Sequence, residues 1–274
     1  MSDFESFIRD YFDSFGDNRI AEAMRYAMEG GKRFRARLIF ALCEDMGLDK
    51  EIAYPAALAL EMVQSYSLIH DDLPAMDNDD FRRGKPTVHK AFGEDIAILA
   101  GDALLTHSFG VIASSDYDSD TKADMIDALS RYAGMEGMVY GQLLDLTTNI
   151  PELDEKRLRD IQVNKTGGLF KIACLFAMEI AGKKEKDWFI SLGEKIGIAF
   201  QDQDDLFDIL KSEEEMGKSL SDLRNEKPSA IALYEKDELI RIIGDEFEDM
   251  YQHLLRASFA ADCTRTLLEA LQKR

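Results

Sequence analysis

Helical periodicity runs through most of the chain and restricts it to helical architectures. Ile20, Met24, Ala27 and Met28 recur at helix spacing, and the glycine pair at 30–31 then supplies a C-terminal stop. Good helix formers are also concentrated in the segments 53–69, 96–114, 122–139, 156–181, 186–209 and 238–255. Strand-like alternation is not evident, so an all-α fold is predicted.

The helical segments read as parts of one domain. The prolines mark their boundaries and stand at Pro55, Pro74, Pro86, Pro151 and Pro228. The candidate loops 77–87, 116–120, 149–153, 182–185 and 212–228 are short or lie between helices that carry related motifs. With 46% hydrophobic residues among 274, the composition suits a substantial core, and we predict a single domain over residues 1–274.

The charge balance argues against polyanionic partners. A net charge of -20, from 33 basic and 53 acidic residues, repels nucleic acids and anionic membrane surfaces. The N-terminus is acidic and shows no signal peptide, and Asp102 and His107 interrupt the most apolar window, 96–113, so no membrane span is expected. The odd number of cysteines, set apart in apolar sequence, fits reduced thiols in the cytoplasm: Cys43, Cys174 and Cys263.

An acidic cluster at 204–208 lies within a predicted helix. Asp204 and Asp208 are four residues apart and therefore share one face. Like charges at that spacing destabilise a bare helix by a few tenths of a kcal/mol, roughly 0.2–0.5. The arrangement makes physical sense if a divalent cation lies between or above the two carboxylates.

A second acidic cluster, at 71–77, follows an apolar helix. Asp71 and Asp77 would face apart on a continuous helix. Pro74 disfavours helical geometry at Leu73, so the chain is expected to break there and to bring Asp77 back beside Asp71. Acidic runs are often only solvated faces, but two clusters far apart in sequence also suit Mg²⁺ ions completed by diphosphate oxygens.

Cations stand beside both clusters against the acidic background. The segment 30–37 holds four basic residues, and Arg82, Arg83 and Lys85 follow the first cluster. Arginine matches phosphate oxygens with a planar fork of donors, and glycine lets the backbone approach closely. Lys165 and Lys218 also lie close to glycines. Phosphate recognition is the interpretation that these patterns favour.

Longer motifs in the chain are those of a known family. GGKRFR, SLIHDDLPAMDNDDFRRGKPTVH, LAGDALL, GQLLD, KTG and QDDLFD occur in the family's order. At these residues the chain resembles the trans-isoprenyl diphosphate synthases, most closely the bacterial farnesyl diphosphate synthases, or geranyltranstransferases. The resemblance implies a single-domain all-α isoprenoid synthase-type helical bundle around a central apolar cavity. It also implies a homodimer.

The same resemblance implies an activity and its ligands. The enzyme would join isopentenyl diphosphate to an allylic diphosphate, dimethylallyl or geranyl, with three Mg²⁺ held by Asp71, Asp77 and Asp204. The residues implied to contact the allylic diphosphate or to serve catalysis are Arg82, Lys165, Thr166, Gln201 and Lys218. The residues implied to bind isopentenyl diphosphate are Lys32, Arg35 and Arg83, with Asp72, Asp205 and Asp208 close to the metals.

The chain departs from the family pattern at two positions, and the resemblance also implies which residue limits the length of the product. The family usually has Pro where this chain has Ala36, and His in the isopentenyl site where it has Gln64. Tyr66 and Ser67 precede Asp71, and Tyr66 lies roughly 7.5 Å below it along the helix axis. A bulky aromatic there implies farnesyl diphosphate as the product, although core packing is the ordinary alternative for such a residue.

Several other functions stay open at this level. A geranylgeranyl diphosphate synthase would differ only in product length. A terpene cyclase would not need the GGKRFR segment or a second acidic cluster. A non-catalytic subunit of a hetero-oligomeric prenyl transferase would be expected to lack one cluster, and both are present here.

Overall fold

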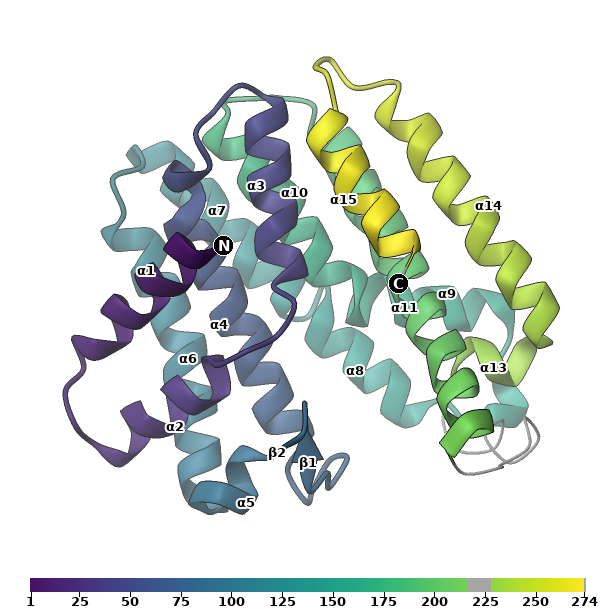
Figure 1. The fold of residues 1–274 in the computed structure, drawn as a ribbon, viewed down its shortest axis with the longest axis horizontal. Coiled ribbons are helices and arrows are strands. Elements are labelled where there is room, and N and C mark those ends of the chain that lie inside the picture. The colour runs from purple at the N-terminus through teal and green to yellow at the C-terminus, as the bar shows by residue number, and fades with distance from the viewer. Residues whose placement is uncertain (216–227, 274) are drawn as a thin grey trace.

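The computed structural model of the protein describes residues 1–215 and 228–273, and these are helical apart from loops and one short hairpin (Figure 1). The elements of the first half are α1 (Ser2–Asp13), α2 (Arg19–Met28), α3 (Phe34–Asp45), η1 (Lys50–Ala53), α4 (Tyr54–Asp71), β1 (Phe81–Arg82), β2 (Lys85–Pro86), α5 (Val88–Phe92), α6 (Glu94–Ser114) and α7 (Ser119–Ala133).

The second half continues the bundle. Its elements are α8 (Met138–Thr147), η2 (Ile150–Glu152), α9 (Glu155–Lys165), α10 (Gly167–Ile180), α11 (Lys186–Glu215), α13 (Ala230–Leu233), α14 (Lys236–Leu254) and α15 (Asp262–Gln272). Helices α4 and α10 lie at the centre: α4 packs along α6 and α3, and α10 packs against α3, α7 and α11. From Gly167 to Met178 every residue of α10 is buried, as expected for a helix that is apolar on all sides.

One continuous core of buried side chains links the elements from α1 to α15, which confirms the predicted all-α, single-domain fold. Two predicted boundaries were wrong. The segment 156–181 is two helices with a break at Thr166, where a Cβ on Gly197 would lie 2.4 Å from the Cα of Gly167, so α11 approaches this turn closely. The segment 122–139 ends at Ala133, because the chain turns through Gly134 and Gly137 before α8.

Helix α6 differs from the expectation for the apolar window 96–113. By length and composition it is apolar enough to cross a membrane, with a mean hydropathy of 1.7 over its most apolar stretch. It packs against α4, α2 and α5 within the bundle, and 39% of that stretch is buried. A core helix of a soluble protein meets the same test, so this single helix is weak evidence for a membrane protein.

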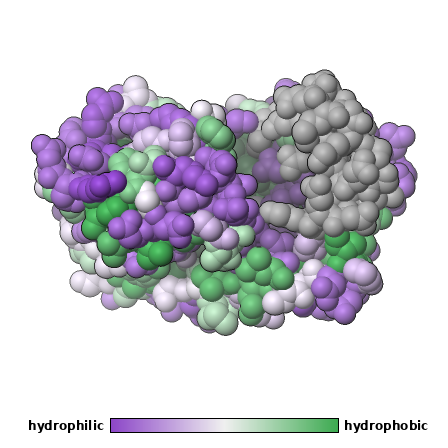
Figure 2. Space-filling model, turned by 90° about the horizontal axis from the view of Figure 1, so that it is seen from below, coloured by the Kyte–Doolittle hydropathy of each residue, from purple (hydrophilic) through white to green (hydrophobic). Residues whose placement is uncertain are grey.

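Three sequence-distant segments meet at one end of the bundle. The C-terminal end of α4, the β1–β2 hairpin and the C-terminal part of α11 all lie at the lower end in Figure 1. Figure 2 looks on to this end, where hydrophilic side chains border a hollow. The fold therefore brings both acidic clusters to the same face.

Candidate active site

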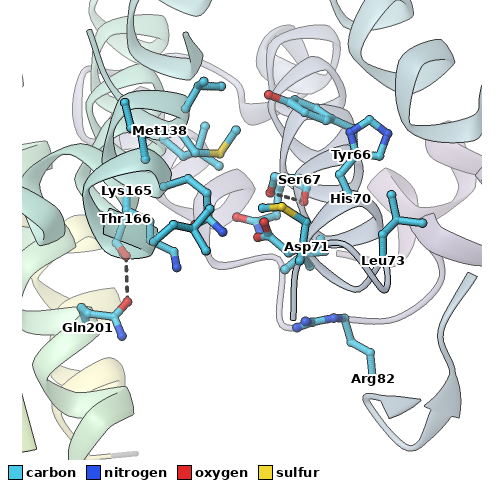
Figure 3. A pocket seen from close by; sticks show the side chains of 18 of the residues that line it. Tyr66, Ser67, His70, Asp71, Leu73, Arg82, Met138, Lys165, Thr166 and Gln201 are labelled. Carbon is cyan, nitrogen blue, oxygen red and sulfur yellow. Dashed lines mark hydrogen bonds between the residues drawn. The ribbon is translucent and has the colours of Figure 1, made fainter. Parts of the chain in front are cut away.

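A cavity of about 890 Å³ opens among α4, α6, α8, α9 and α11. Figure 3 shows Lys165, Thr166 and Gln201 on one side of it, opposite Asp71 and Arg82. The apolar part of the wall comes mainly from α8, with Met138, Val139, Leu143 and Leu146. The cavity therefore has a charged region and an apolar region, as a ligand with a charged head and a hydrocarbon tail requires.

The first acidic cluster forms the turn that follows α4. The amide of Asp77 donates to the carbonyl of Asp71 at 2.8 Å, and Asn78 has a left-handed φ of 54°. The chain thus leaves the helix around Pro74 and returns Asp77 beside Asp71, as predicted from the sequence. Burial, together with the charge of Asp77, raises the pKa of Asp71 to about 6 although Lys165 opposes the shift.

The hairpin attaches to this turn through an ion pair. Asp72 is buried and accepts a hydrogen bond of 2.7 Å from Arg82 Nε, and Arg82 Nη2 lies 2.6 Å from the same carboxylate. Arg83, the next residue, has a left-handed φ of 54°, and its guanidinium lies so close to Gly31 that a Cβ there would be 2.8 Å from Nη1. The second glycine of GGKRFR, Gly31, therefore makes room for Arg83.

A second, cationic cavity of about 380 Å³ adjoins the first. Both are lined by Arg35, Gln64 and Arg83, and Lys32 lines only the smaller one. Burial lowers the pKa of Arg35 to about 10, so this guanidinium, which lies 4.6 Å over the ring of Phe170, stays cationic at neutral pH. The structure thus brings together the residues predicted to bind isopentenyl diphosphate.

Glu61 is a residue of this region that sequence reasoning missed. It is buried, its Oε2 pairs with Arg33 Nη1 at 3.2 Å, and its Oε1 accepts from the amide of Ala36 at 3.3 Å. A proline at position 36 has no amide hydrogen to donate. The departure from the family pattern at Ala36 therefore adds a hydrogen bond between α3 and α4. A glutamate in the middle of an apolar helix was the available signal.

The opposite wall is built by α9 and α11. Lys165 pairs with Asp145 of α8, and Thr166 Oγ1 donates to Gln201 Oε1 at 2.8 Å. Asp204 lines the cavity one turn beyond Gln201. The pairing of Asp145 with Lys165 gives the GQLLD motif a defined contact.

Neighbouring carboxylates of the second acidic cluster differ in role, since one holds two helices together and the other faces the cavity. Asp205 is buried, and it accepts one hydrogen bond from Gln201 Nε2 at 2.9 Å and another from the amide of Ala230 at 2.8 Å. It therefore ties α11 to α13, whereas Asp204 faces the cavity. Two predicted residues cannot be placed: Lys218 and the side chain of Asp208 lie outside the described residues.

The acids predicted to bind metal stand on two walls. Within residues 1–215 and 228–273, no three His, Cys, Asp or Glu side chains cluster closely enough to hold a metal ion by themselves. Asp71 and Asp77 come from the turn after α4 and Asp204 from α11. Such an arrangement suits an ion that has one or two carboxylate ligands and takes others from a bound diphosphate.

Comparison with known proteins agrees with this geometry. A family described as Polyprenyl synthetase matches residues 17–255. The farnesyl diphosphate synthase of Micrococcus luteus is 37% identical over 98% of this chain and 94% of its own length. The geranylgeranyl diphosphate synthase of Cyanophora paradoxa is 43% identical over 81% of this chain and 76% of its own length.

Solved structures show the same fold. A geranyltransferase from Legionella pneumophila superposes with a TM-score of 0.86 at 31% identity, over 100% of this chain and 94% of that one. The Helicobacter pylori geranyltransferase, solved with magnesium and isoprenyl diphosphate, gives a TM-score of 0.83 at 29% identity, over 100% and 97% of the two chains. Sequence and fold thus agree along nearly the whole chain, and it belongs to the polyprenyl synthetase family.

Proposed function

We propose that the protein is a magnesium-dependent trans-prenyltransferase that joins isopentenyl diphosphate to dimethylallyl or geranyl diphosphate and makes farnesyl diphosphate. The observation that carries the proposal is the pairing of two adjoining cavities. One combines acids and cations with an apolar wall, and the other is lined by Lys32, Arg35 and Arg83. Two diphosphates, one of them with a prenyl tail, fit that division.

The residues of each wall have separate tasks in this reaction. Arg82 and Lys165 lie on opposite sides of the cavity and can hold the allylic diphosphate between them. Lys32, Arg35 and Arg83 would orient isopentenyl diphosphate so that its double bond faces the allylic carbon. The departing diphosphate would accept the proton that is lost after the new carbon–carbon bond forms.

The oxygens of Thr166 and Gln201 complete this wall. Thr166 Oγ1 and Gln201 Oε1 lie together at the cavity, where their partial negative charge would stabilise the developing allylic cation. The apolar walls from α8 would exclude water that could otherwise capture the cation.

The donor set fits magnesium. Burial and neighbouring acids raise the pKa of Asp71, and a bound cation would relieve that crowding of negative charge. We propose three Mg²⁺ ions held by Asp71, Asp77 and Asp204, with diphosphate oxygens as the remaining ligands. When bound, magnesium would neutralise the negative charge that develops on the leaving diphosphate. Lys218 belongs to the proposal on sequence grounds alone.

Tyr66 is proposed to limit the product to fifteen carbons, with Ser67 beside it in the same wall. The Tyr66 side chain is buried at the cavity and its ring packs edge-on against His70, with 5.8 Å between centroids. His70 itself is held by α6, because its Nε2 lies 3.3 Å from the carbonyl oxygen of Ile98 and its ring fills the space beside Gly101. This wall is therefore rigid.

Substitution of the tyrosine tests the product assignment. Tyr66→Ala should shift the product to chains longer than farnesyl diphosphate, measured by chromatography of the hydrolysed products. The matched control is Tyr140→Ala, which removes a ring from the exposed part of α8 and should leave the profile unchanged. An unaltered profile for Tyr66→Ala would contradict the proposed role.

A geranylgeranyl diphosphate synthase is the second candidate, favoured by the 43% identity to the Cyanophora paradoxa relative. One assay separates the possibilities: purified protein with Mg²⁺, isopentenyl diphosphate and each allylic starter, followed by measurement of product length. A fifteen-carbon product supports the proposal and a twenty-carbon product the alternative. A cyclic product from the allylic substrate alone would indicate a cyclase, and no turnover an inert subunit.

We also propose that residues 1–274 act as one polyprenyl synthase domain, in a homodimer in the cytoplasm. The continuous core from α1 to α15 supports the single domain. Exposed apolar side chains on α6, Ile98 and Leu99, support association with a second copy. Sedimentation of the purified protein tests the dimer.

A further inference from the structure

A buried polar network joins three helices behind the second acidic cluster. Asp202 of α11 is fully buried and accepts hydrogen bonds from Arg159 Nη1 at 2.7 Å and from Gln162 Nε2. Arg159 Nη1 also donates to Gln162 Oε1 at 2.8 Å, and Arg159 Nη2 lies 2.9 Å from Glu246 Oε1 of α14. One guanidinium therefore ties α9 to both α11 and α14.

The network is electrically balanced only if one carboxyl is protonated. Burial and the neighbouring Asp202 raise the pKa of Glu246 well above its usual range, although Arg159 opposes the shift. A protonated Glu246 can donate to Asp202, which satisfies a carboxyl oxygen that otherwise has no partner among the described residues. The network then holds one positive and one negative charge, each with several hydrogen bonds.

The network lies on the side of α11 that points away from the cavity, where α11 packs against α9. Asp202 and Asp204 are two residues apart on α11, so their side chains point in nearly opposite directions. Asp204 faces the cavity while Asp202 faces α9. On α9, Gln162 belongs to the network and Lys165, one turn later, faces the cavity.

Hydrogen bonds therefore hold α9 against α11 in two places. The Thr166–Gln201 hydrogen bond fastens it at the cavity, and the Asp202 network fastens it in the interior. Burial of charged groups seldom adds more stability than apolar packing would. Directional hydrogen bonds do, however, fix the helix register in a way that apolar side chains do not.

We infer that the network of Asp202, Arg159, Gln162 and Glu246 positions α9 against α11. In this position Lys165 and Asp204 can both contact the same bound magnesium diphosphate. The inference rests on the proposed function. Asp202 acts through Asp204 and Lys165 and touches no substrate. Its loss should weaken the binding of magnesium diphosphate more than that of isopentenyl diphosphate, because the segment 30–37 and the hairpin supply the cations of the isopentenyl site and α11 supplies only Phe200.

The test compares Asp202→Leu and Asp202→Asn with the wild-type protein. Titration calorimetry would measure the binding of inorganic diphosphate in the presence of Mg²⁺, independently of turnover. Groups behind metal ligands typically change affinity by about 10–100-fold, and for Asp202→Leu we expect weakening of about 10-fold. The half-saturating Mg²⁺ concentration and kcat should change in parallel, while KM for isopentenyl diphosphate should change less than the affinity for magnesium diphosphate.

The matched control breaks another ion pair between α11 and α14. Lys195 and Asp249 pair near the surface, so Asp249→Asn removes a link between these helices without touching the network. It should bind magnesium diphosphate as the wild type does. If the Asp202 variants are folded by circular dichroism and also bind like the wild type, the inference is overturned.

Two further results can be distinguished from failure of the inference, one in which a variant does not fold and one in which the proposed function is wrong. If Asp202→Leu does not fold, Asp202→Asn, which preserves the shape, decides the question by the same measurement. If the wild-type protein binds magnesium diphosphate but condenses no isopentenyl diphosphate, the proposed function fails while the effect of Asp202 on binding can still be read.

Discussion

The two acidic clusters reach the same cavity by different structural means. The first lies in a turn whose shape is local: α4 ends at Asp71, the chain bends around Pro74, and the Asp77 amide closes the turn on the Asp71 carbonyl. The second lies on a continuous helix, and its direction depends on long-range contacts. There Asp202 is bound to α9 and Asp205 to the start of α13.

This difference predicts different sensitivities. A locally defined turn should tolerate changes elsewhere in the bundle but not changes of its own residues. A helix-borne carboxylate keeps its local geometry, and its position should depend on how α11 packs. Substitutions can therefore separate the chemistry of the carboxylates from the means by which each is held.

Removal of a carboxylate from either wall should have the largest effect. Asp71→Asn and Asp204→Asn should each lower kcat/KM by more than the roughly 10–100-fold loss typical of groups behind metal ligands, because each would remove a direct ligand. Steady-state assays at saturating Mg²⁺ measure the effect. Asp80→Asn, an exposed acid of the same loop that pairs with Lys90, is the control. Activity close to that of the wild type in either main variant would remove that residue from the metal site.

Loss of the cation behind each cluster should affect stability unequally. Arg159→Met deprives buried Asp202 of its cation and should cost roughly 3–5 kcal/mol of unfolding free energy. Arg82→Met deprives Asp72 of its cation, but the Arg82 side chain is 33% exposed against 24% for Arg159, and Arg159 also binds Glu246, so the cost should be smaller, about 2 kcal/mol. Urea unfolding of the ligand-free proteins measures both. Equal losses would contradict the distinction between local and long-range support.

Features that depend on neighbouring residues in the chain could be predicted from the sequence, whereas contacts between distant elements could not. The return of Asp77 to Asp71 follows from Pro74, and the helix that carries Asp204 follows from the helix formers at 186–209. The ion pair of Arg82 with Asp72 and the contact of Arg159 with Asp202 depend on packing between elements, which spacing alone does not give. The break at Thr166 was missed for the same reason, since the close approach of Gly197 is visible only in three dimensions.

Substitution of Gln64, two turns before Asp71 on α4, should separate the binding of isopentenyl diphosphate from the binding of the allylic substrate. Gln64 lies on α4 between the two cavities, and its Oε1 is buried with no partner among the described residues. Gln64→His should lower KM for isopentenyl diphosphate several-fold, by about 1 kcal/mol, because a protonated imidazole forms a charge-assisted hydrogen bond. KM for the allylic substrate should not change. An unchanged or higher KM for isopentenyl diphosphate would count against this placement.

The last prediction concerns Glu246, the neutral member of the network behind the second cluster. The groups that face Glu246 are Asp202 and Arg159, and Tyr234 lies near both. Because the folded protein raises the pKa of Glu246 above the unfolded value of about 4.3, the native state binds the extra proton. Stability therefore falls as pH rises from about 4.3 toward the raised pKa.

Glu246→Gln keeps an amide that can donate to Asp202 and an oxygen for Arg159, but it cannot titrate. The variant should therefore gain stability relative to the wild type as pH rises from about 5 to 8, by less than about 1.4 kcal/mol for each pH unit, the limit for a single group. Urea unfolding at several pH values measures the difference. Glu248→Gln, at an exposed position of α14, controls for the loss of a surface charge. Parallel pH profiles for Glu246→Gln and the wild type would mean that Glu246 is ionised in the folded state, and Arg159 would then hold two carboxylates.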